Sequence, residues 1–288
     1  MKWADFSKLI KTRLTTLVVF SASISFLIGC RANGHIVWID WVKLIIGGFL
    51  VTSAANAFNE IIEKDLDRLM KRTMDRPIPS GKMTTGQALV LGLGMGMAGT
   101  YLLGSLNLFT VLLSVFSILL YAFAYTPLKR KSGIAAVFVG AIPGALPPLI
   151  GYVAAQVHGR IDEIALILFS IQFIWQFVHF WAIAWVLDDD YKLAGFRLLP
   201  SGKRDLTSAV ITFIFAIVLV PVSLLPTFYG YGGYWVGGVS LICSLIFLYQ
   251  SFMLLRTRQI PEARKLMFGS FFYLPVVQIM FLVDFIVK

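Results

Sequence analysis

The chain has few charged residues, three histidines and only two cysteines in 288 residues. Asp, Glu, Lys and Arg make up 14% of the sequence, against about 25% in soluble globular domains, while the hydrophobic share reaches 58%. This balance excludes a soluble domain. Cys30 and Cys243 lie in apolar stretches far apart in the chain, so we expect two small apolar side chains and no disulfide framework.

Long apolar runs dominate the sequence, and each has about the 20 residues that a helix needs to cross a bilayer. We therefore predict an all-α, polytopic membrane protein in which residues 1–288 form one domain, with nine transmembrane helices bundled around a central cavity. The glycine-rich third segment is expected to pack closely against a neighbour. The fifth segment carries three prolines, so it is either broken or continuous, and we expect it to form a cavity wall. The segments are 14–30, 42–60, 86–104, 108–126, 134–155, 163–187, 208–228, 234–255 and 268–287.

The basic residues are distributed unevenly over the loops. With the amino terminus placed in the cytoplasm, all but four of the 25 Lys and Arg residues fall on the cytoplasmic side, as expected for cytoplasmic loops. The exceptions are Arg31, Lys43, Arg160 and Lys288. The pattern predicts a plasma (inner) membrane protein whose carboxyl terminus lies outside.

The net charge of +10 is spread over separate loops, so it indicates contact with anionic lipid headgroups and no nucleic-acid partner. The basic, amphipathic residues 1–13 are expected to lie along the membrane surface as a headgroup anchor. Because no cleaved signal or transit peptide is evident, we expect the chain to insert directly.

A dense polar block follows the second apolar segment. Asn59, Glu63 and Asp67 are spaced by four residues, and each such step rotates by only about 40° around a helix. One helix face therefore presents three oxygen-bearing side chains. Such hard ligands suit Mg²⁺, which is usually shared with the phosphates of a substrate. Basic side chains follow and can neutralise the remaining phosphate charge: Arg68, Lys71, Arg72 and Arg76.

The alternative for this block is a solvated charged loop anchored by its basic residues. Two features favour a functional site. The carboxylates begin within a turn of the apolar helix, where an ionisable group is costly. The sequence Arg-Pro-Ile-Pro-Ser-Gly at 76–81 predicts that the helix stops there in a loop of defined shape.

A second polar group lies at the end of the sixth segment. Gln172, His179 and Asp190 fall within about 20° of one another on a helix, and Gln176 lies about 60° away, which predicts an inward-facing polar stripe. The alternative for His179 is a histidine of the core whose ring nitrogen forms a hydrogen bond with a glutamine. The stripe ends in three consecutive aspartates that include Asp189, and these predict a second metal-binding cluster facing the first.

The fourth segment ends in Tyr125, Lys129 and Arg130. Tyrosines and lysines are ordinary anchors at a membrane interface, which is the alternative to a site role. Since these residues fall on the same side as the carboxylates, Lys129 and Arg130 can also hold a diphosphate oxygen. Two acidic clusters, basic loops and an apolar cavity together predict a site that grips a diphosphate through Mg²⁺ while a hydrocarbon tail lies among the helices.

The pattern Asn59-x-x-x-Glu63-x-x-x-Asp67 resembles the first signature of the UbiA superfamily of intramembrane prenyltransferases, and residues 188–190 resemble its second acidic signature. Longer motifs are similar to those of the protoheme IX farnesyltransferases, or heme O synthases. These motifs are Asp65-Leu-Asp67-x-x-Met70-x-Arg72-Thr73-x-x-Arg76-Pro77, Tyr125-Thr126-x-x-Lys129-Arg130, Gly144-Ala-x-Pro147-Pro148-x-Ile150-Gly151-Tyr152 and Trp175-Gln176-x-x-His179-Phe180, followed by Asp190-Tyr191-x-x-Ala194-Gly195.

The resemblance implies transfer of a farnesyl group from farnesyl diphosphate to a vinyl group of heme b, with addition of water, to give heme O and diphosphate. It implies Mg²⁺ as cofactor, and farnesyl diphosphate, heme b and the lipid bilayer as partners. Heme O would serve terminal oxidases directly or as the precursor of heme A, so a heme A synthase or an oxidase assembly is a further expected partner.

The resemblance also implies roles for individual residues. Many superfamily members have Asp where this chain has Glu60 and Glu63, which leaves open which carboxylate contacts the metal. The implied metal ligands and catalytic residues are Asn59, Glu63, Asp67, Asp189 and Asp190. The implied substrate-binding residues are Arg72, Arg76, Tyr125, Lys129, Arg130, Gln176, His179 and Tyr191.

Two other functions remain open. One is a UbiA-type prenyltransferase that acts on an aromatic quinone precursor or chlorophyllide, but the motifs around Arg72 and His179 favour a heme acceptor. The other is a transporter. Transporters often have two related halves, and the sequence shows no convincing repeat beyond the two acidic clusters.

Overall fold

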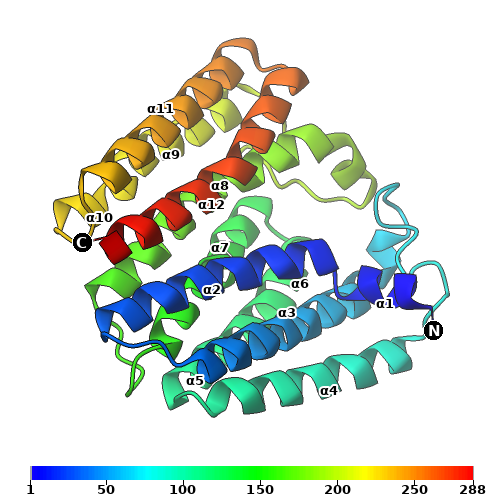
Figure 1. Cartoon of the computed structure of the whole chain (residues 1–288). Coiled ribbons are helices and arrows are strands. Elements are labelled where there is room, and N and C mark those ends of the chain that lie inside the picture. The colour runs from blue at the N-terminus through cyan, green and yellow to red at the C-terminus, as the bar shows by residue number, and fades with distance from the viewer. Residues whose placement is uncertain (1, 288) are drawn as a thin grey trace.

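The computed structural model describes residues 2–287, and in this range the chain is a bundle of helices without strands (Figure 1). Its two termini lie at opposite ends of the bundle. The helices are α1 (Trp3–Leu9), α2 (Thr12–Ala32), α3 (Trp38–Asp67), α4 (Thr85–Gly104), α5 (Leu108–Ile118), the π-helix η1 (Leu119–Tyr125), α6 (Thr126–Leu128), α7 (Gly133–Ala154), α8 (Glu163–Leu193), α9 (Leu206–Ser223), α10 (Leu225–Phe228), α11 (Tyr234–Thr257) and α12 (Ile260–Val287).

Within residues 2–287, nine helical spans are long and apolar enough to cross a membrane, as predicted. One of them joins α5, η1 and α6, and another joins α9 and α10. The chain is therefore a multi-pass membrane protein. Its long helices extend past the apolar runs at one end: α3 continues to Asp67, α8 continues to Leu193, and α12 begins at Ile260. Hydropathy does not detect these extensions because they are polar.

Local sequence sets the start of five of the helices. In each case the side chain of the residue before the helix accepts a hydrogen bond from the backbone N–H of the third helical residue, which satisfies one of the donors exposed there. These capping residues are Thr84, Asn107, Ser132, Asp162 and Asp205.

The spans pack in two groups within the described chain. Buried side chains of α8, α9, α11 and α12 form one core, which includes Trp185 and Phe247. Buried side chains contributed mainly by α2, α3, α7 and α8 form the other, which includes Phe26 and Tyr152. Because α8 contributes to both cores and α12 packs against α2 as well as α8, the groups form one membrane domain.

Helix α7 is continuous despite its three prolines, Pro143, Pro147 and Pro148. A proline leaves the carbonyl four residues before it without its helical donor. Pro148 does this to Gly144, whose carbonyl oxygen instead accepts a hydrogen bond of 2.7 Å from Nε2 of Gln172 on α8. A neighbouring helix therefore satisfies the backbone that the proline exposes at membrane depth.

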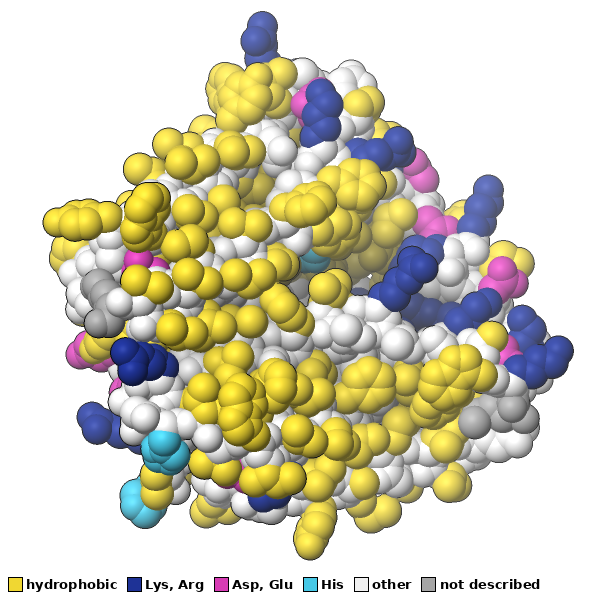
Figure 2. Space-filling view, in the orientation of Figure 1, with side chains coloured by type: hydrophobic (Ala, Val, Ile, Leu, Met, Phe, Trp, Pro, Cys, Tyr) yellow, Lys and Arg dark blue, Asp and Glu magenta, His cyan; other side chains and the backbone are white. Residues whose placement is uncertain are grey.

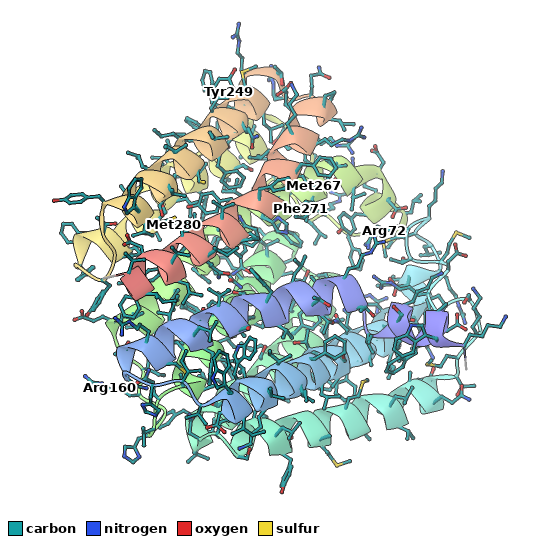
Figure 3. The ribbon with its side chains drawn as sticks, viewed as in Figure 1. Arg72, Arg160, Tyr249, Met267, Phe271 and Met280 are labelled. Atoms are coloured by element: carbon teal, nitrogen blue, oxygen red, sulfur yellow. The ribbon has the colours of Figure 1, made fainter. Side chains whose placement is uncertain are left out.

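Most of the Lys and Arg side chains lie at one end of the bundle. We call it the basic end, and it consists of residues 2–11 and the loops 68–84, 129–132, 194–205 and 258–259. Hydrophobic side chains cover most of the face shown in Figure 2, while Lys and Arg gather along its right side and top, where these loops lie. Arg160 lies at the opposite end (Figure 3). Lys288 lies outside the described residues.

The start of the chain, whose role as a surface anchor stays a prediction, also packs against the protein. Leu9 and Ile10 are fully buried, and Leu9 packs in a small cluster with Ala57, Ile78 and Met83. Trp3 is 76% exposed and remains available to the membrane interface. The basic lead is therefore held by the protein itself, because its apolar residues find partners on α3 and in the loop that follows α3.

Helix α4 packs tightly on α3, as its glycines predicted. A Cβ added to Gly99 would lie 2.9 Å from the carbonyl oxygen of Gly47 and from the backbone nitrogen of Val51. We expect Gly99→Ala to lower the free energy of unfolding by about 1–3 kcal/mol, because backbone atoms cannot yield as a flexible side chain does. The thermal unfolding midpoint in detergent measures this loss.

Gly94→Ala is the matched control on the same helix, because a Cβ there meets no heavy atom within 4 Å. It should leave the unfolding midpoint unchanged or slightly raised. Equal midpoints for the two variants would contradict the tight α3–α4 contact.

Candidate active site

The predicted carboxylate face of α3 is buried at the basic end. Asn59, Glu63 and Asp67 all lie on this helix and are at most 5% exposed. Nδ2 of Asn59 donates to Oε2 of Glu63 at 2.9 Å. Asp65 is exposed and lies 3.6 Å from Arg68, as expected for the opposite face. Spacing by four residues therefore identified the buried polar face correctly.

Cations from other elements surround this face. Nη1 of Arg76 lies 2.6 Å from Oδ2 of Asp67, and Lys129 forms an ion pair with Oε1 of Glu63. Nζ of Lys11 donates to Oδ1 of Asn59 at 2.7 Å. Burial lowers the pKa of the Lys11 ammonium to about 7, and the nearby Arg76 acts in the same direction. Positive charge thus converges on the carboxylates from the α3–α4 and α6–α7 loops, and the amino-terminal segment adds the Lys11 amine, which loses part of its charge near neutral pH.

Helix α3 ends at Asp67, well before the prolines that were expected to stop it. The hydroxyl of Thr73 donates to the Asp67 carbonyl at 2.9 Å, so a side chain satisfies a carbonyl at the helix end. The backbone N–H of Ile78 donates to Oε1 of Glu60, which is fully buried. Glu60 therefore fixes the loop, and Arg76 reaches back to Asp67 from that loop.

The π-helical segment η1 positions the next residues. The hydroxyl of Thr126 donates to the Tyr121 carbonyl at 2.8 Å and accepts from Nδ2 of Asn59 at 3.0 Å. Nζ of Lys129 lies 4.8 Å from the centre of the Tyr125 ring. Single π-helical turns are frequent at functional sites. Here the turn brings Tyr125 and Lys129 beside the carboxylate face.

The aspartates at the end of α8 have different surroundings. Asp188 is buried and contacts Lys192 at 2.6 Å, whereas the side chain of Asp189 is 75% exposed and lies 2.9 Å from Arg204. Oδ1 of Asp190 accepts from the backbone N–H of Lys71 at 2.8 Å. The structure thus brings Asp190 to the α3–α4 loop and leaves Asp189 at the surface. Successive residues on a helix point about 100° apart, so these carboxylates do not share a face.

Basic and aromatic side chains join the two acidic regions. Cζ of Arg72 lies 5.7 Å from the centre of the Tyr191 ring, and Figure 3 shows Arg72 between the α3–α4 loop and the end of α8. Nζ of Lys129, which is paired with Glu63, lies 5.5 Å from the centre of the Phe196 ring. Arg130 is exposed, and the structure of residues 2–287 places it in no side-chain contact with this group.

The polar stripe of α8 divides between two neighbouring helices. Nε2 of Gln176 donates to the carbonyl of Ala141 on α7. His179 faces α12 instead: its Nδ1 lies 2.6 Å from the hydroxyl of Ser270, and its ring stacks on Trp175. Both side chains therefore have protein partners, and their roles toward a substrate stay predictions.

An apolar cavity opens beneath the carboxylate face, between α2, α3, η1 and α7. On α3 it runs from Leu44 to Asn56, which is about 18 Å along the helix axis, and Asn56 is one turn below Asn59. The predicted wall of α7 is confirmed, since several of its glycines and prolines line the cavity. The lining on α7 is Gly140, Pro143, Gly144, Pro147 and Ile150.

The site also suits a divalent cation in its donor chemistry. In the part of the chain that the structure describes, no three His, Cys, Asp or Glu side chains gather into a complete metal site. Yet Oδ1 of Asp67 and Oδ2 of Asp190 are buried without a hydrogen-bond partner there. Magnesium is usually bound through one or two carboxylates and the phosphates of a substrate, so these two oxygens fit its binding chemistry.

Sequence reasoning missed Lys11 and Thr126 as site residues. No spacing relates Lys11 to Asn59, because the two lie on different elements and meet only when α1 packs against α3. Thr126 belongs to the motif Tyr125-Thr126-x-x-Lys129-Arg130, but nothing in its local sequence indicates its contact with Asn59.

The UbiA prenyltransferase family matches residues 18–274. The chain is 44% identical to the protoheme IX farnesyltransferase of Cytophaga hutchinsonii over 279 residues, which cover 96% of each chain. It is 40% identical to the protein of the same name from Christiangramia forsetii over 288 residues, which cover 98% of this chain and 93% of that one.

Solved structures share the fold. A digeranylgeranylglyceryl phosphate synthase superposes with a TM-score of 0.82 at 21% identity and covers 99% of both chains. A UbiA homologue from Archaeoglobus fulgidus, bound to GPP and Mg²⁺, superposes with a TM-score of 0.66 at 12% identity and covers 96% of this chain and 99% of that one. At these identities the likeness shows the architecture alone.

Because Asp67 is fully buried, its ion pair with Arg76 should hold the α3–α4 loop in place. We expect Arg76→Gln to lower the free energy of local opening by about 3 kcal/mol, since it leaves a buried charge unpaired. Amide hydrogen exchange in residues 68–83 should then be roughly 100-fold faster.

Lys82→Gln removes the same charge from an exposed position in the same loop and should change exchange little. Unchanged exchange in Arg76→Gln would show that the ion pair does not hold the loop.

Proposed function

The chain belongs to the UbiA prenyltransferase family and is a prenyltransferase, and we propose that it transfers the farnesyl group of farnesyl diphosphate to a vinyl group of heme b. The observation that carries this proposal is the buried carboxylate face of α3, which lies among cations directly above an apolar cavity. The names of the relatives support the farnesyl donor and the heme acceptor.

In this proposal the diphosphate of the donor binds at the carboxylate face. Arg72, Arg76 and Lys129 bind its oxygens from one side, and Lys11 binds from the amino-terminal segment. Asn59, Glu63 and Asp67 would hold a first Mg²⁺, and Asp190 a second, while Asp189 must turn from its contact with Arg204 to take part. Bound magnesium supplies positive charge that stabilises the leaving diphosphate.

The farnesyl tail then lies in the cavity beneath. Its lining is mostly apolar, and the cavity begins one helical turn below Asn59, so the reacting carbon sits at the boundary between the polar site and the membrane interior. Tyr121 lines the cavity, and the centre of its ring lies 5.5 Å from that of Tyr125, so both rings would lie near the reacting end of the tail. Aromatic faces attract a cation, and the dry walls keep water from an allylic cation until the acceptor reacts.

The chemistry balances as follows. The bond between the first farnesyl carbon and its oxygen breaks, and its electron pair leaves with diphosphate. The π electrons of a vinyl group of heme b form the new carbon–carbon bond, which leaves a cation beside the porphyrin ring. Water adds to this cation and loses a proton, which gives the hydroxyethylfarnesyl group of heme O.

The surroundings of the reaction follow from the same arrangement. Gln176 and His179 lie in the membrane-spanning part of α8, the first beside α7 and the second beside α12, where they would orient the porphyrin. The basic end faces the cytoplasm of a plasma (inner) membrane and carries the amino terminus, and the carboxyl terminus lies outside. Heme O would pass to a terminal oxidase assembly, directly or through a heme A synthase.

A direct assay tests the proposal. Membranes that contain this protein, supplied with labelled farnesyl diphosphate, heme b and Mg²⁺, should form labelled heme O, whereas membranes without the protein should not. Chelation of divalent cations should abolish the product, and added Mg²⁺ should restore it, because the donor set of the site needs a cation to neutralise the diphosphate. Label found only on an aromatic acceptor such as 4-hydroxybenzoate would reject the heme acceptor in favour of a quinone precursor.

Two aspartates on one helix provide a matched pair of variants. Asp67→Asn should lower kcat by roughly 100-fold to 1,000-fold, as expected when a group that stabilises the departing charge is removed. Asp65→Asn should retain activity within about twofold, since Asp65 is exposed and forms only a surface pair. Full activity in a folded Asp67→Asn protein would place the reaction elsewhere and would revive the transporter alternative.

A further inference from the structure

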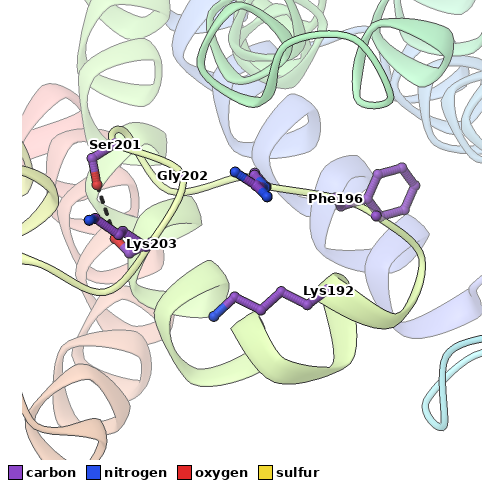
Figure 4. Close-up of a pocket in the computed structure, with 7 residues that line it drawn as sticks. Lys192, Phe196, Ser201, Gly202 and Lys203 are labelled. Carbon is purple, nitrogen blue, oxygen red and sulfur yellow. Dashed lines mark hydrogen bonds between the residues drawn. The ribbon is translucent and has the colours of Figure 1, made fainter.

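A second cavity lies at the basic end, where the chain turns from α8 to α9. Its volume is about 590 Å³. Figure 4 shows Lys192 extending from the end of α8 toward the side that carries Ser201 and Lys203, while the ring of Phe196 points the other way. The reaction proposed above does not use this cavity, which we call the basic pocket. Its lining residues are Lys192, Gly195, Phe196, Arg197, Ser201, Gly202 and Lys203.

The protein balances only part of the positive charge of the basic pocket. Lys192 pairs with Asp188, and the neighbouring Arg204 pairs with Asp189. Arg197 and Lys203, by contrast, are exposed and form no ion pair with any residue of the described chain, although the carboxylate of Asp205 beside the lining attracts Lys203. The lining contains no acidic residue. Two unpaired cations in one concave surface suit a ligand with two negative charges.

The loop that carries these cations is held in a defined shape. The hydroxyl of Ser201 donates to Oδ1 of Asp205 at 2.7 Å, and the backbone N–H of Ser201 donates to the hydroxyl of Ser208 at 3.1 Å. Gly195 and Gly202 have φ angles of 74° and 80°, which residues with a side chain rarely adopt. The pocket is therefore preorganised, which reduces the entropy lost when a ligand binds.

The basic pocket adjoins the candidate active site. Phe196, which is 1% exposed, forms part of the pocket wall, and its ring lies 5.5 Å from Nζ of Lys129. Lys129 is the residue that pairs with Glu63 on the carboxylate face. A ligand anchored in the pocket by one edge can therefore extend toward the reacting end of the prenyl donor.

We propose that the basic pocket binds the two propionate carboxylates of the porphyrin acceptor, with Arg197 and Lys203 as their principal partners. The proposal rests on the function proposed above. In heme b the vinyl and propionate groups occupy opposite halves of the macrocycle. Holding the carboxylates at the water-facing loop directs the vinyl edge into the membrane domain, and it spares these charges the cost of entering an apolar site.

The test uses the full-length protein in bilayer discs of neutral phosphatidylcholine, with heme b and its dipropionate dimethyl ester as alternative acceptors. We expect Arg197→Gln/Lys203→Gln to raise KM for heme b about tenfold or more, as loss of charge-assisted hydrogen bonds predicts. The KM for farnesyl diphosphate and kcat should not change. The dimethyl ester, which lacks the two charges, should react equally with the wild type and the variant.

Arg264→Gln is the matched control, because it removes an exposed positive charge from the same end of the molecule but outside the pocket. It should leave KM for both acceptors unchanged. An equal rise in KM for heme b and its ester, or no rise for either, would overturn the proposal. The KM of the variant could instead rise equally for both acceptors, and only in discs that contain anionic lipid. That result would assign the pocket to a lipid headgroup.

Failure of the proposed function would be recognised separately. If the wild-type protein forms no heme O, the pocket can still be tested by titrating the Soret absorbance of heme b with the wild type and with Arg197→Gln/Lys203→Gln. Weaker binding of heme b, but not of the dimethyl ester, by the variant would support the carboxylate site. Equal binding by the two proteins would overturn it.

Discussion

The structure depends on the neutralisation of buried carboxylates at the end of α3. Glu63 and Asp67 are at most 5% exposed, and a charge in such a position is costly unless it is paired. Lys129 and Arg76 supply the pairing from two loops, and Lys11 donates a hydrogen bond to the neighbouring Asn59. These contacts tie the amino-terminal segment, the α3–α4 loop and the α6–α7 loop to one helix. The carboxylates that give the site its chemistry therefore also hold its parts together.

Helix α7 lines the apolar cavity inside the membrane with backbone and small side chains. Its prolines and glycines leave room beneath the carboxylate face, but each proline also removes a backbone donor. Gln172 on α8 supplies the missing donor to Gly144. Its carbonyl oxygen accepts from Ser21 on α2 and Gln278 on α12, so one amide joins four helices. The cavity wall is stable because polar side chains at membrane depth are satisfied by other helices.

The basic end combines regions of different electrostatic character. Around α3, cations and carboxylates pair closely, so the region carries little uncompensated charge until a substrate and a metal enter. In the loop between α8 and α9, Arg197 and Lys203 form no ion pair within the described residues. Phe196 and Lys129 connect these regions. A donor and an acceptor that both carry negative charge can therefore be held at neighbouring positions, each with its uncharged part toward the membrane.

The sequence by itself determined the class of protein, its membrane spans and the face formed by Asn59, Glu63 and Asp67, because apolar run length and helical periodicity are local properties. It did not determine that Lys11 meets Asn59, that Asp189 points to the surface while Asp190 meets Lys71, or that His179 and Gln176 face different helices. These contacts join residues far apart in the chain. They depend on how helices rotate and pack against one another, and only the tertiary structure decided that.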